Sequence, residues 1–215
     1  NNSGYEDVRA KIAENINKKY NVKLTKNNLV MTCGAAGGLN IILKTLLNPG
    51  DEVIVFSPFF GEYENYVKNF DGRLVIIPSD SETFEPDLNE LEDKVNSRTK
   101  AVIINSPNNP TGVVYSEELI KGMAEVLNRK QQKFNTSIYL ISDEPYREIV
   151  YDGVEVPYIL NYYRNSFVGY SYSKSLSLPG ERIGYVVCSS DADDFDNIMQ
   201  SLNVANRILG FVNAP

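Results

Sequence analysis

The residues best suited to chemistry lie in Ser171–Tyr185, which reads SYSKSLSLPGERIGY. Lys174 stands among four serines, including Ser171 and Ser173, and Arg182 follows eight residues later. A deprotonated lysine amine can form a Schiff base with an aldehyde, and an arginine with hydroxyl donors can bind a phosphate. Pyridoxal 5′-phosphate (PLP), a phosphorylated aldehyde, requires this combination. The alternative is a solvated, serine-rich loop in which Lys174 has no chemical role.

Two further candidate ligand contacts follow predicted strands in the first third of the chain. The small residues Gly34, Ala35 and Ala36 lie between a strand and a helical pattern. Backbone N–H groups at the start of a helix can bind an anion, although a tight turn that needs glycine gives the same sequence. Phe60 follows the next predicted strand and can stack on a flat heteroaromatic ring, or it can simply pack in the core.

Polar side chains follow two later strands. Asn109 lies in Asn105–Gly112, which reads NSPNNPTG and predicts a rigid loop. Its amide can donate to a ligand oxygen. Asp143 directly follows another strand, and a carboxylate there can pair with a pyridinium N–H, which makes the ring an electron sink. Tyr146, three residues on, could donate to the phenolic oxygen of such a ring. An ordinary Asn-Pro turn and a helix-capping aspartate are the alternatives.

The elements that must position these residues follow from hydrophobic periodicity. Strands that are apolar throughout and joined by helices indicate an α/β fold, with a mostly parallel, seven-stranded sheet and helices on both faces. Ligands of such sheets bind beyond the carboxyl ends of the strands, where the candidate residues fall. The predicted strands are 29–32, 53–56, 74–77, 101–105, 138–142, 167–170 and 184–188. The predicted helices are 5–20 (begun by a capping box of Ser3 and Glu6), 39–47, 61–70, 87–95, 117–130 and 191–209.

Composition narrows the function classes. The 215-residue chain has a net charge of −7, which argues against a nucleic-acid partner, and no histidine. Without histidine, this chain cannot build a Ser-His-Asp triad or a His-ligated metal site, and we expect no metal. No apolar run approaches the roughly 20 residues of a membrane helix. Cys33 and Cys188 lie in apolar stretches and are predicted to be free interior thiols, so we expect a cytoplasmic protein.

Five motifs, in this order, resemble the class I/II aminotransferases of the aspartate aminotransferase fold type: GAAGG, SPFF, NSPNNPTG, SDEPY and SYSKSLSLPGERIGY. The resemblance covers nearly the whole chain and implies a role for each candidate residue. Lys174 would form the Schiff base with PLP and later move a proton, and Asp143 would hold the pyridine nitrogen. The remaining contacts would be Asn109 and Tyr146 at the phenolic oxygen, Phe60 on the ring face, and Gly34, Ala35, Ala36, Ser171, Ser173 and Arg182 at the phosphate.

The resemblance also implies an organisation and a reaction. Residues 1–215 would form a single cofactor-binding large domain, with the family's N-terminal arm and C-terminal small domain outside the chain and little or no activity in isolation. The reaction would move an amino group from an amino acid to a 2-oxo acid, in a homodimeric full-length protein. Two alternatives use the same cofactor residues. One is another PLP reaction, such as a carbon–sulfur lyase or a cyclopropane-forming synthase, and the other is a non-catalytic PLP-binding sensor domain of a regulator.

Overall fold

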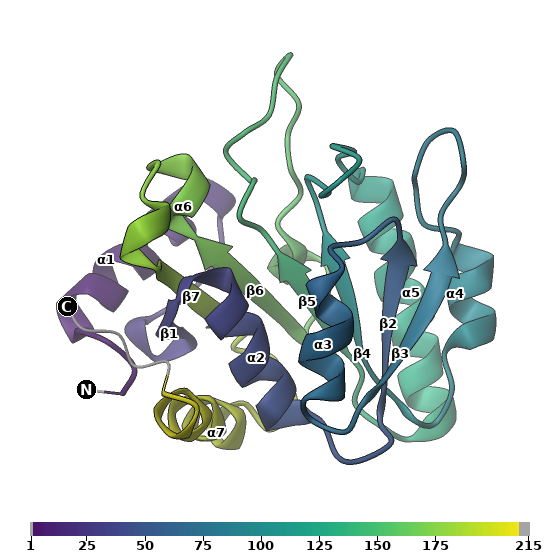
Figure 1. Cartoon of the computed structure of the whole chain (residues 1–215), viewed down its shortest axis with the longest axis horizontal. Helices are drawn as coiled ribbons and strands as arrows, with labels where there is room; N and C mark the ends of the chain where they lie inside the picture. Colours follow the sequence, from purple (N-terminus) through teal and green to yellow (C-terminus); the bar gives the residue numbers. More distant parts are fainter. Residues whose placement is uncertain (1, 211–215) are drawn as a thin grey trace.

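A computed structural model describes residues 2–210, and one seven-stranded sheet forms its centre (Figure 1). The strands lie in the order β1-β7-β6-β5-β4-β2-β3. β7 is antiparallel to both of its neighbours, and the other neighbouring pairs are parallel. This mostly parallel sheet confirms the predicted α/β class. The strands are Leu29–Cys33 (β1), Glu52–Ser57 (β2), Arg73–Pro78 (β3), Thr99–Asn105 (β4), Tyr139–Asp143 (β5), Ser166–Ser171 (β6) and Ile183–Cys188 (β7).

Helices cover both faces of the sheet (Figure 1). Successive strand side chains point to opposite faces, so Val55 and Ile103 pack under α2, α3 and α7, whereas Ile54 and Val102 pack under α1, α4 and α5. The helices are Glu6–Tyr20 (α1), Gly34–Leu46 (α2), Glu62–Lys68 (α3), Leu88–Lys94 (α4), Glu117–Phe134 (α5), Tyr172–Ser175 (α6) and Phe195–Ile208 (α7). Three short 3-10 turns are Lys26–Asn28, Ile159–Asn161 and Pro179–Glu181.

The longest helix, α5, shows how local sequence sets its ends. Ser116 precedes it, and the Ser116 hydroxyl accepts from the backbone N–H of Leu119 at 3.1 Å. Glu117 and Glu118 place negative charge in the first turn, where it interacts favourably with the helix dipole. The helix runs four residues past its predicted end and stops at Asn135, which adopts the left-handed conformation (φ 49°).

Helix α2 begins five residues earlier than the sequence predicts. Its first turn is the glycine- and alanine-rich stretch at Gly34, which was expected to precede the helix. Packing explains the glycines: a Cβ on Gly38 would lie 2.9 Å from Cγ2 of Val186 in β7. The small residues therefore let this helix approach the sheet closely.

The predicted capping box at the N-terminus of α1 is wrong. The residue before the helix is Tyr5, and no side chain caps the first turn. Glu6 instead forms an ion pair with Lys26 at 2.5 Å, and the carbonyl of Ser3 accepts from the backbone N–H of Met31 at 3.0 Å. The first residues are thus held by β1 rather than by a local cap.

The structure of residues 2–210 bears on two predictions, that the cysteines are free interior thiols and that no helix spans a membrane. Cys33 and Cys188 are both free thiols, but only Cys188 is buried, whereas Cys33 is half-buried at the end of β1. Among the described helices, none is long and apolar enough to cross a membrane.

Candidate active site

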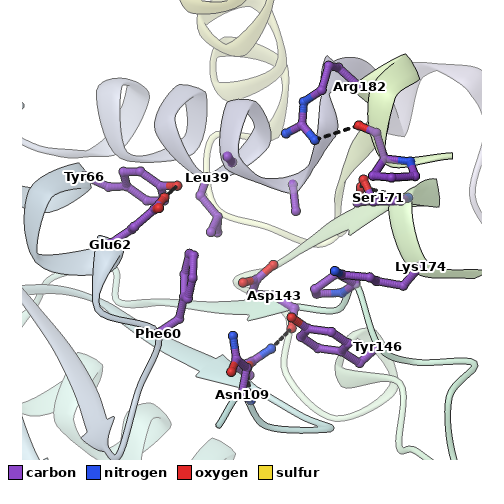
Figure 2. Close-up of a pocket in the computed structure, with 16 residues that line it drawn as sticks. Leu39, Phe60, Glu62, Tyr66, Asn109, Asp143, Tyr146, Ser171, Lys174 and Arg182 are labelled. Atoms are coloured by element: carbon purple, nitrogen blue, oxygen red, sulfur yellow. Dashed lines mark hydrogen bonds between the residues drawn. The ribbon is translucent and has the colours of Figure 1, made fainter. Parts of the chain in front are cut away.

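A cavity of about 350 Å³ opens at the carboxyl edge of the sheet (Figure 2). Its volume falls in the range of about 300–1,000 Å³ that is typical of small-molecule sites. Ten of the eleven residues predicted for the site line it, and Gly34 lies directly beside it. The lining residues are Ala35, Ala36, Leu39, Phe60, Glu62, Tyr66, Asn105, Asn109, Asp143, Pro145, Tyr146, Ser171, Ser173, Lys174, Pro179 and Arg182.

The sheet topology explains this convergence. The lining residues follow the carboxyl ends of β1, β2, β4, β5 and β6, and parallel strands bring these ends to one edge. Arg182 reaches this edge from an amino end instead. It directly precedes β7, which is antiparallel to its neighbours, so the amino end of β7 lies at the same edge of the sheet. Residues separated by almost 150 positions in the sequence therefore face one space.

One end of the cavity is lined by hydrogen-bond donors and a guanidinium that can bind an anion. The first turn of α2 has backbone N–H groups without partners inside the helix, and the Oγ atoms of Ser171 and Ser173 lie 2.8 Å apart. Arg182 adopts a left-handed backbone conformation (φ 52°), and its Nη1 donates to the carbonyl of Pro179 at 3.1 Å. Gly34 also has a positive φ of 69°, and a Cβ there would lie 3.1 Å from Nη2 of Arg182. The guanidinium and the start of the helix therefore approach each other closely.

Lys174 lies on the short helix α6, beside the cavity. Its Nζ is 5.9 Å from the centroid of the Tyr146 ring. Ser175 anchors the helix, because its Oγ lies 2.8 Å from the Tyr170 hydroxyl, which in turn lies 2.8 Å from Oε2 of Glu148. This hydrogen-bonded network joins β6 and the helix that carries Lys174 to the segment after β5.

Asp143 lies in the middle of the ring of side chains in Figure 2. It is the last residue of β5, rather than the first residue after it, and is 5% exposed. Its carbonyl accepts from Nδ2 of Asn105 at 2.7 Å, and its Oδ2 accepts from the Tyr63 hydroxyl at 2.6 Å. Oδ1 is buried and has no hydrogen-bond partner among the described residues. The pKa of this carboxyl is raised to about 7: burial is the main cause, the Tyr63 hydrogen bond acts in the opposite direction, and the charge of Glu144 adds to the rise.

The remaining predicted contacts flank Asp143. The backbone N–H of Asn109 donates to Oδ1 of Asn105 at 2.6 Å, which ties the loop after β4 to the end of β5. Burial raises the pKa of Tyr146, with a further contribution from Asp143, while a hydrogen bond with Asn109 lowers it. Phe60 is half-buried at the opposite wall.

Sequence reasoning missed two residues that organise the site. Asn105 was recognised only as part of a loop motif, although its amide holds both Asp143 and the Asn109 loop. Tyr63 was not considered, and it lies 80 positions from the aspartate that it contacts. It lies three residues after Phe60, in the predicted helix 61–70, but nothing local in the sequence pointed to Asp143.

The site can hold a flat, phosphorylated aldehyde. The unpartnered Oδ1 of Asp143 suits a protonated ring nitrogen, because an unpaired buried carboxylate oxygen is costly. The hydroxyls, the arginine and the helix start suit a phosphate, and Lys174 supplies the amine. The residues present therefore fit PLP.

Comparisons with known proteins identify several chains that are similar to this one. A family model described as aminotransferase class I and II matches residues 1–212. A probable aspartate aminotransferase of Methanocaldococcus jannaschii is 31% identical over 208 residues, which are 97% of this chain and 52% of that protein. An aminotransferase structure from Eubacterium rectale has a TM-score of 0.97 and 47% identity, over 99% of this chain and 54% of that one. A structure of aspartate aminotransferase from Thermus thermophilus with maleate has a TM-score of 0.87 and 28% identity, over 99% and 53% of the two chains. The chain thus spans about half the length of the relatives that it matches.

Proposed function

The chain belongs to the class I and II aminotransferase family, and we propose that its protein uses PLP to transfer an amino group from an amino acid to a 2-oxo acid. Residues 1–215 would serve as a single cofactor-binding domain. The observation that carries the proposal is the cavity itself, where an amine, an unpartnered carboxylate oxygen and an anion cradle face one space. Each of these groups would bind a different part of one cofactor.

The phosphate end would be held by the first turn of α2 together with Ser171, Ser173 and Arg182. The backbone N–H groups of Gly34, Ala35 and Ala36 and the partial positive charge of the helix start favour an anion. The planar guanidinium can donate to two phosphate oxygens at once. These contacts would fix the position of the cofactor without taking part in bond breaking.

The ring would be held by residues on the opposite side. Asp143 would accept from the ring nitrogen and keep it protonated, Asn109 and Tyr146 would donate to the phenolic oxygen, and Phe60 would stack on the ring face. When bound, the cofactor supplies an electron sink for the carbanion that forms at the substrate Cα. The carboxylate of Asp143 would stabilise the positive charge that this chemistry needs at the ring.

Lys174 would act twice. Its Nζ would bind the aldehyde carbon of the cofactor and hold it until a substrate amine replaces it. The freed amine would then take the proton from the substrate Cα and deliver it to the former aldehyde carbon of the cofactor, on the other side of the substrate nitrogen. The Tyr170–Ser175 hydrogen bond would keep this amine in place.

The assembly and the cellular setting stay predictions. Members of this family usually form dimers, so we propose a homodimer for the full protein. The acidic net charge of −7 supports the absence of a nucleic-acid partner, and a cytoplasmic location rests on the free cysteines. The identity of the amino acid and of the 2-oxo acid is left open by the residues of this chain.

The cofactor assignment is tested by absorbance titration of the protein with PLP, beside a Lys174→Ala variant. We expect a new visible band in the parent, no such band in the variant, and a pyridoxyl group on Lys174 after borohydride reduction and mass mapping. PLP-loaded protein with an unmodified Lys174 would contradict the assignment.

The reaction type needs a separate test on the full protein. Amino transfer requires a 2-oxo acid acceptor, whereas release of pyruvate from cystathionine without an acceptor would favour the carbon–sulfur lyase. Binding of PLP with neither activity, together with a DNA-binding segment upstream in the gene, would favour the sensor domain.

A further inference from the structure

Tyr63 forms a direct side-chain hydrogen bond with the carboxyl group of Asp143. The tyrosine lies on α3 and is 1% exposed, and its hydroxyl donates to Oδ2 of Asp143 at 2.6 Å. Two aromatic neighbours fix its ring: Phe60 packs edge-on at 5.6 Å and 78°, and Phe59 is stacked at 6.4 Å and 10°. One buried side chain therefore contacts both the carboxylate and the aromatic residue that are proposed to hold the cofactor ring.

The hydrogen bond fixes one oxygen of the carboxylate and leaves the other unpaired. A free carboxylate could turn to other orientations about its Cβ–Cγ bond, but such a turn here would break a buried hydrogen bond. Oδ1 stays without a partner among the described residues. The bond thus fixes the orientation in which the unpaired oxygen is presented to a ligand.

The hydroxyl also favours the ionised form of a carboxyl group that burial would neutralise. The pKa of Asp143 is raised to about 7, mainly by burial, although the Tyr63 hydrogen bond opposes the rise. Burial, followed by the negative charge of Asp143, raises the pKa of Tyr63 well above its usual value, so the tyrosine remains a donor. The other titratable groups facing Asp143 are Glu144 and Tyr146 on its own segment, Glu62 and Tyr66 on α3, and Lys174 and Arg182 across the cavity.

We propose that Tyr63 is a positioning residue of this site: its hydroxyl holds Oδ2 of Asp143 so that Oδ1 can accept from a protonated ring nitrogen. This role rests on the proposed function, because it requires that PLP binds here. Tyr63 does not touch the reacting atoms and acts through Asp143.

A Tyr63→Phe variant removes only the hydroxyl, and Tyr163→Phe is its matched control. Tyr163 is equally buried, and its hydroxyl donates to the carbonyl of Ile138 at 2.7 Å, at the opposite end of β5 from the cavity. Both variants lose one buried hydrogen bond, so a purely structural effect should be similar in the two. Only Tyr63→Phe should change the pKa of Asp143 and the orientation of its carboxylate.

The first readout needs no cofactor. We expect the titration midpoint of the Asp143 carboxyl, followed by carbon-13 NMR and assigned with Asp143→Asn, to rise by about one pH unit in Tyr63→Phe and to stay unchanged in Tyr163→Phe. In the parent, the ring carbon that carries the Tyr63 hydroxyl should shift with the same midpoint as Asp143. This parent measurement tests the contact even if the variant folds poorly.

The second readout is the PLP dissociation constant against pH. A one-unit rise in the Asp143 midpoint makes binding by Tyr63→Phe about fivefold weaker than by the parent at pH 7, and the ratio falls toward one by about pH 9, where both carboxyl groups are ionised. Equal midpoints and equal dissociation constants in the parent and in Tyr63→Phe would overturn the role of Tyr63 alone. A parent that does not bind PLP would overturn the proposed function and this role with it.

Discussion

At the scale of single residues, Asp143 is buried at a position where its ionised form, the form needed to bind a protonated ring nitrogen, lowers the stability of the cofactor-free protein. A group whose folded pKa lies above its unfolded value contributes stability that is complete below the unfolded pKa and is lost as the pH rises through the folded pKa. For Asp143 this window runs from its usual value of 3.8 to about 7. The cofactor-free protein therefore carries an unfavourable buried charge above neutral pH.

An Asp143→Asn variant should show this cost directly, because asparagine does not ionise. Relative to the parent, we expect its free energy of unfolding to rise by about 1.4 kcal/mol for each pH unit across the window, so that the variant gains most at pH 8. Urea unfolding of both cofactor-free proteins at pH 4.5 and pH 8 measures the difference. A difference that does not change with pH would show that Asp143 titrates normally.

At the scale of elements, β7 and α2 approach so closely that only glycine fits between them. A Cβ on Gly184 would lie 2.3 Å from the carbonyl oxygen of Tyr170 and 2.8 Å from the backbone of Gly34. Both obstacles are main-chain atoms, so neither can move aside by a change of rotamer. The start of α2, and with it the proposed phosphate cradle, depends on this contact.

A Gly184→Ala variant should therefore force β7 and α2 apart. We expect a loss of about 2–3 kcal/mol in the free energy of unfolding, typical of overpacking, together with weaker PLP binding. Gly61→Ala is the control, because a Cβ there meets nothing within 4 Å. Urea unfolding and PLP titration of both variants provide the measurements, and equal behaviour of the two would contradict the packing argument.

Elements with strong local patterns could be predicted from the sequence, and those set by packing could not. The strand at Leu29–Cys33 and the helix at Glu117–Phe134 follow from apolar runs and periodicity. The first turn of α2 was missed because five small residues give no helical pattern, and their reason, close contact with β7, is tertiary. The same limit applied to the site: residues at strand ends were found, whereas Tyr63, which needs a contact across 80 positions, was not.

At the scale of the whole molecule, the buried Arg147 joins the first helix to the segment that carries Tyr146. Arg147 forms an ion pair with Glu144, both almost fully buried, and its guanidinium lies 5.0 Å and 5.1 Å from the rings of Tyr20 and Tyr158. Those two rings stack at 4.4 Å. The guanidinium also donates to the carbonyls of Val156 and Pro157 at 2.8 and 2.9 Å, which closes the long loop after β5. Segments from the start and the middle of the chain are thereby fastened directly behind the cavity.

Replacing the buried Arg147 should lower the free energy of unfolding far more than replacing the exposed Arg129. An Arg147→Met variant leaves the Glu144 carboxylate buried without its cation, and breaking such a pair costs about 3–5 kcal/mol. Arg129→Met, which breaks the exposed pair with Glu92, should cost less than about 1 kcal/mol.

The double variant Glu144→Gln/Arg147→Met separates the two contributions of this pair. If the cost comes from the orphaned carboxylate, neutralising it should restore most of the stability lost in Arg147→Met, because an amide is much less costly to bury than a charge. The stacking of the guanidinium between Tyr20 and Tyr158 would still be lost, worth about 0.5–2 kcal/mol. Urea unfolding of the three proteins gives the cycle. A double variant as unstable as Arg147→Met would instead show that the guanidinium contacts to the two rings and to the loop carbonyls, rather than the charge of Glu144, fasten α1 to the wall of the site.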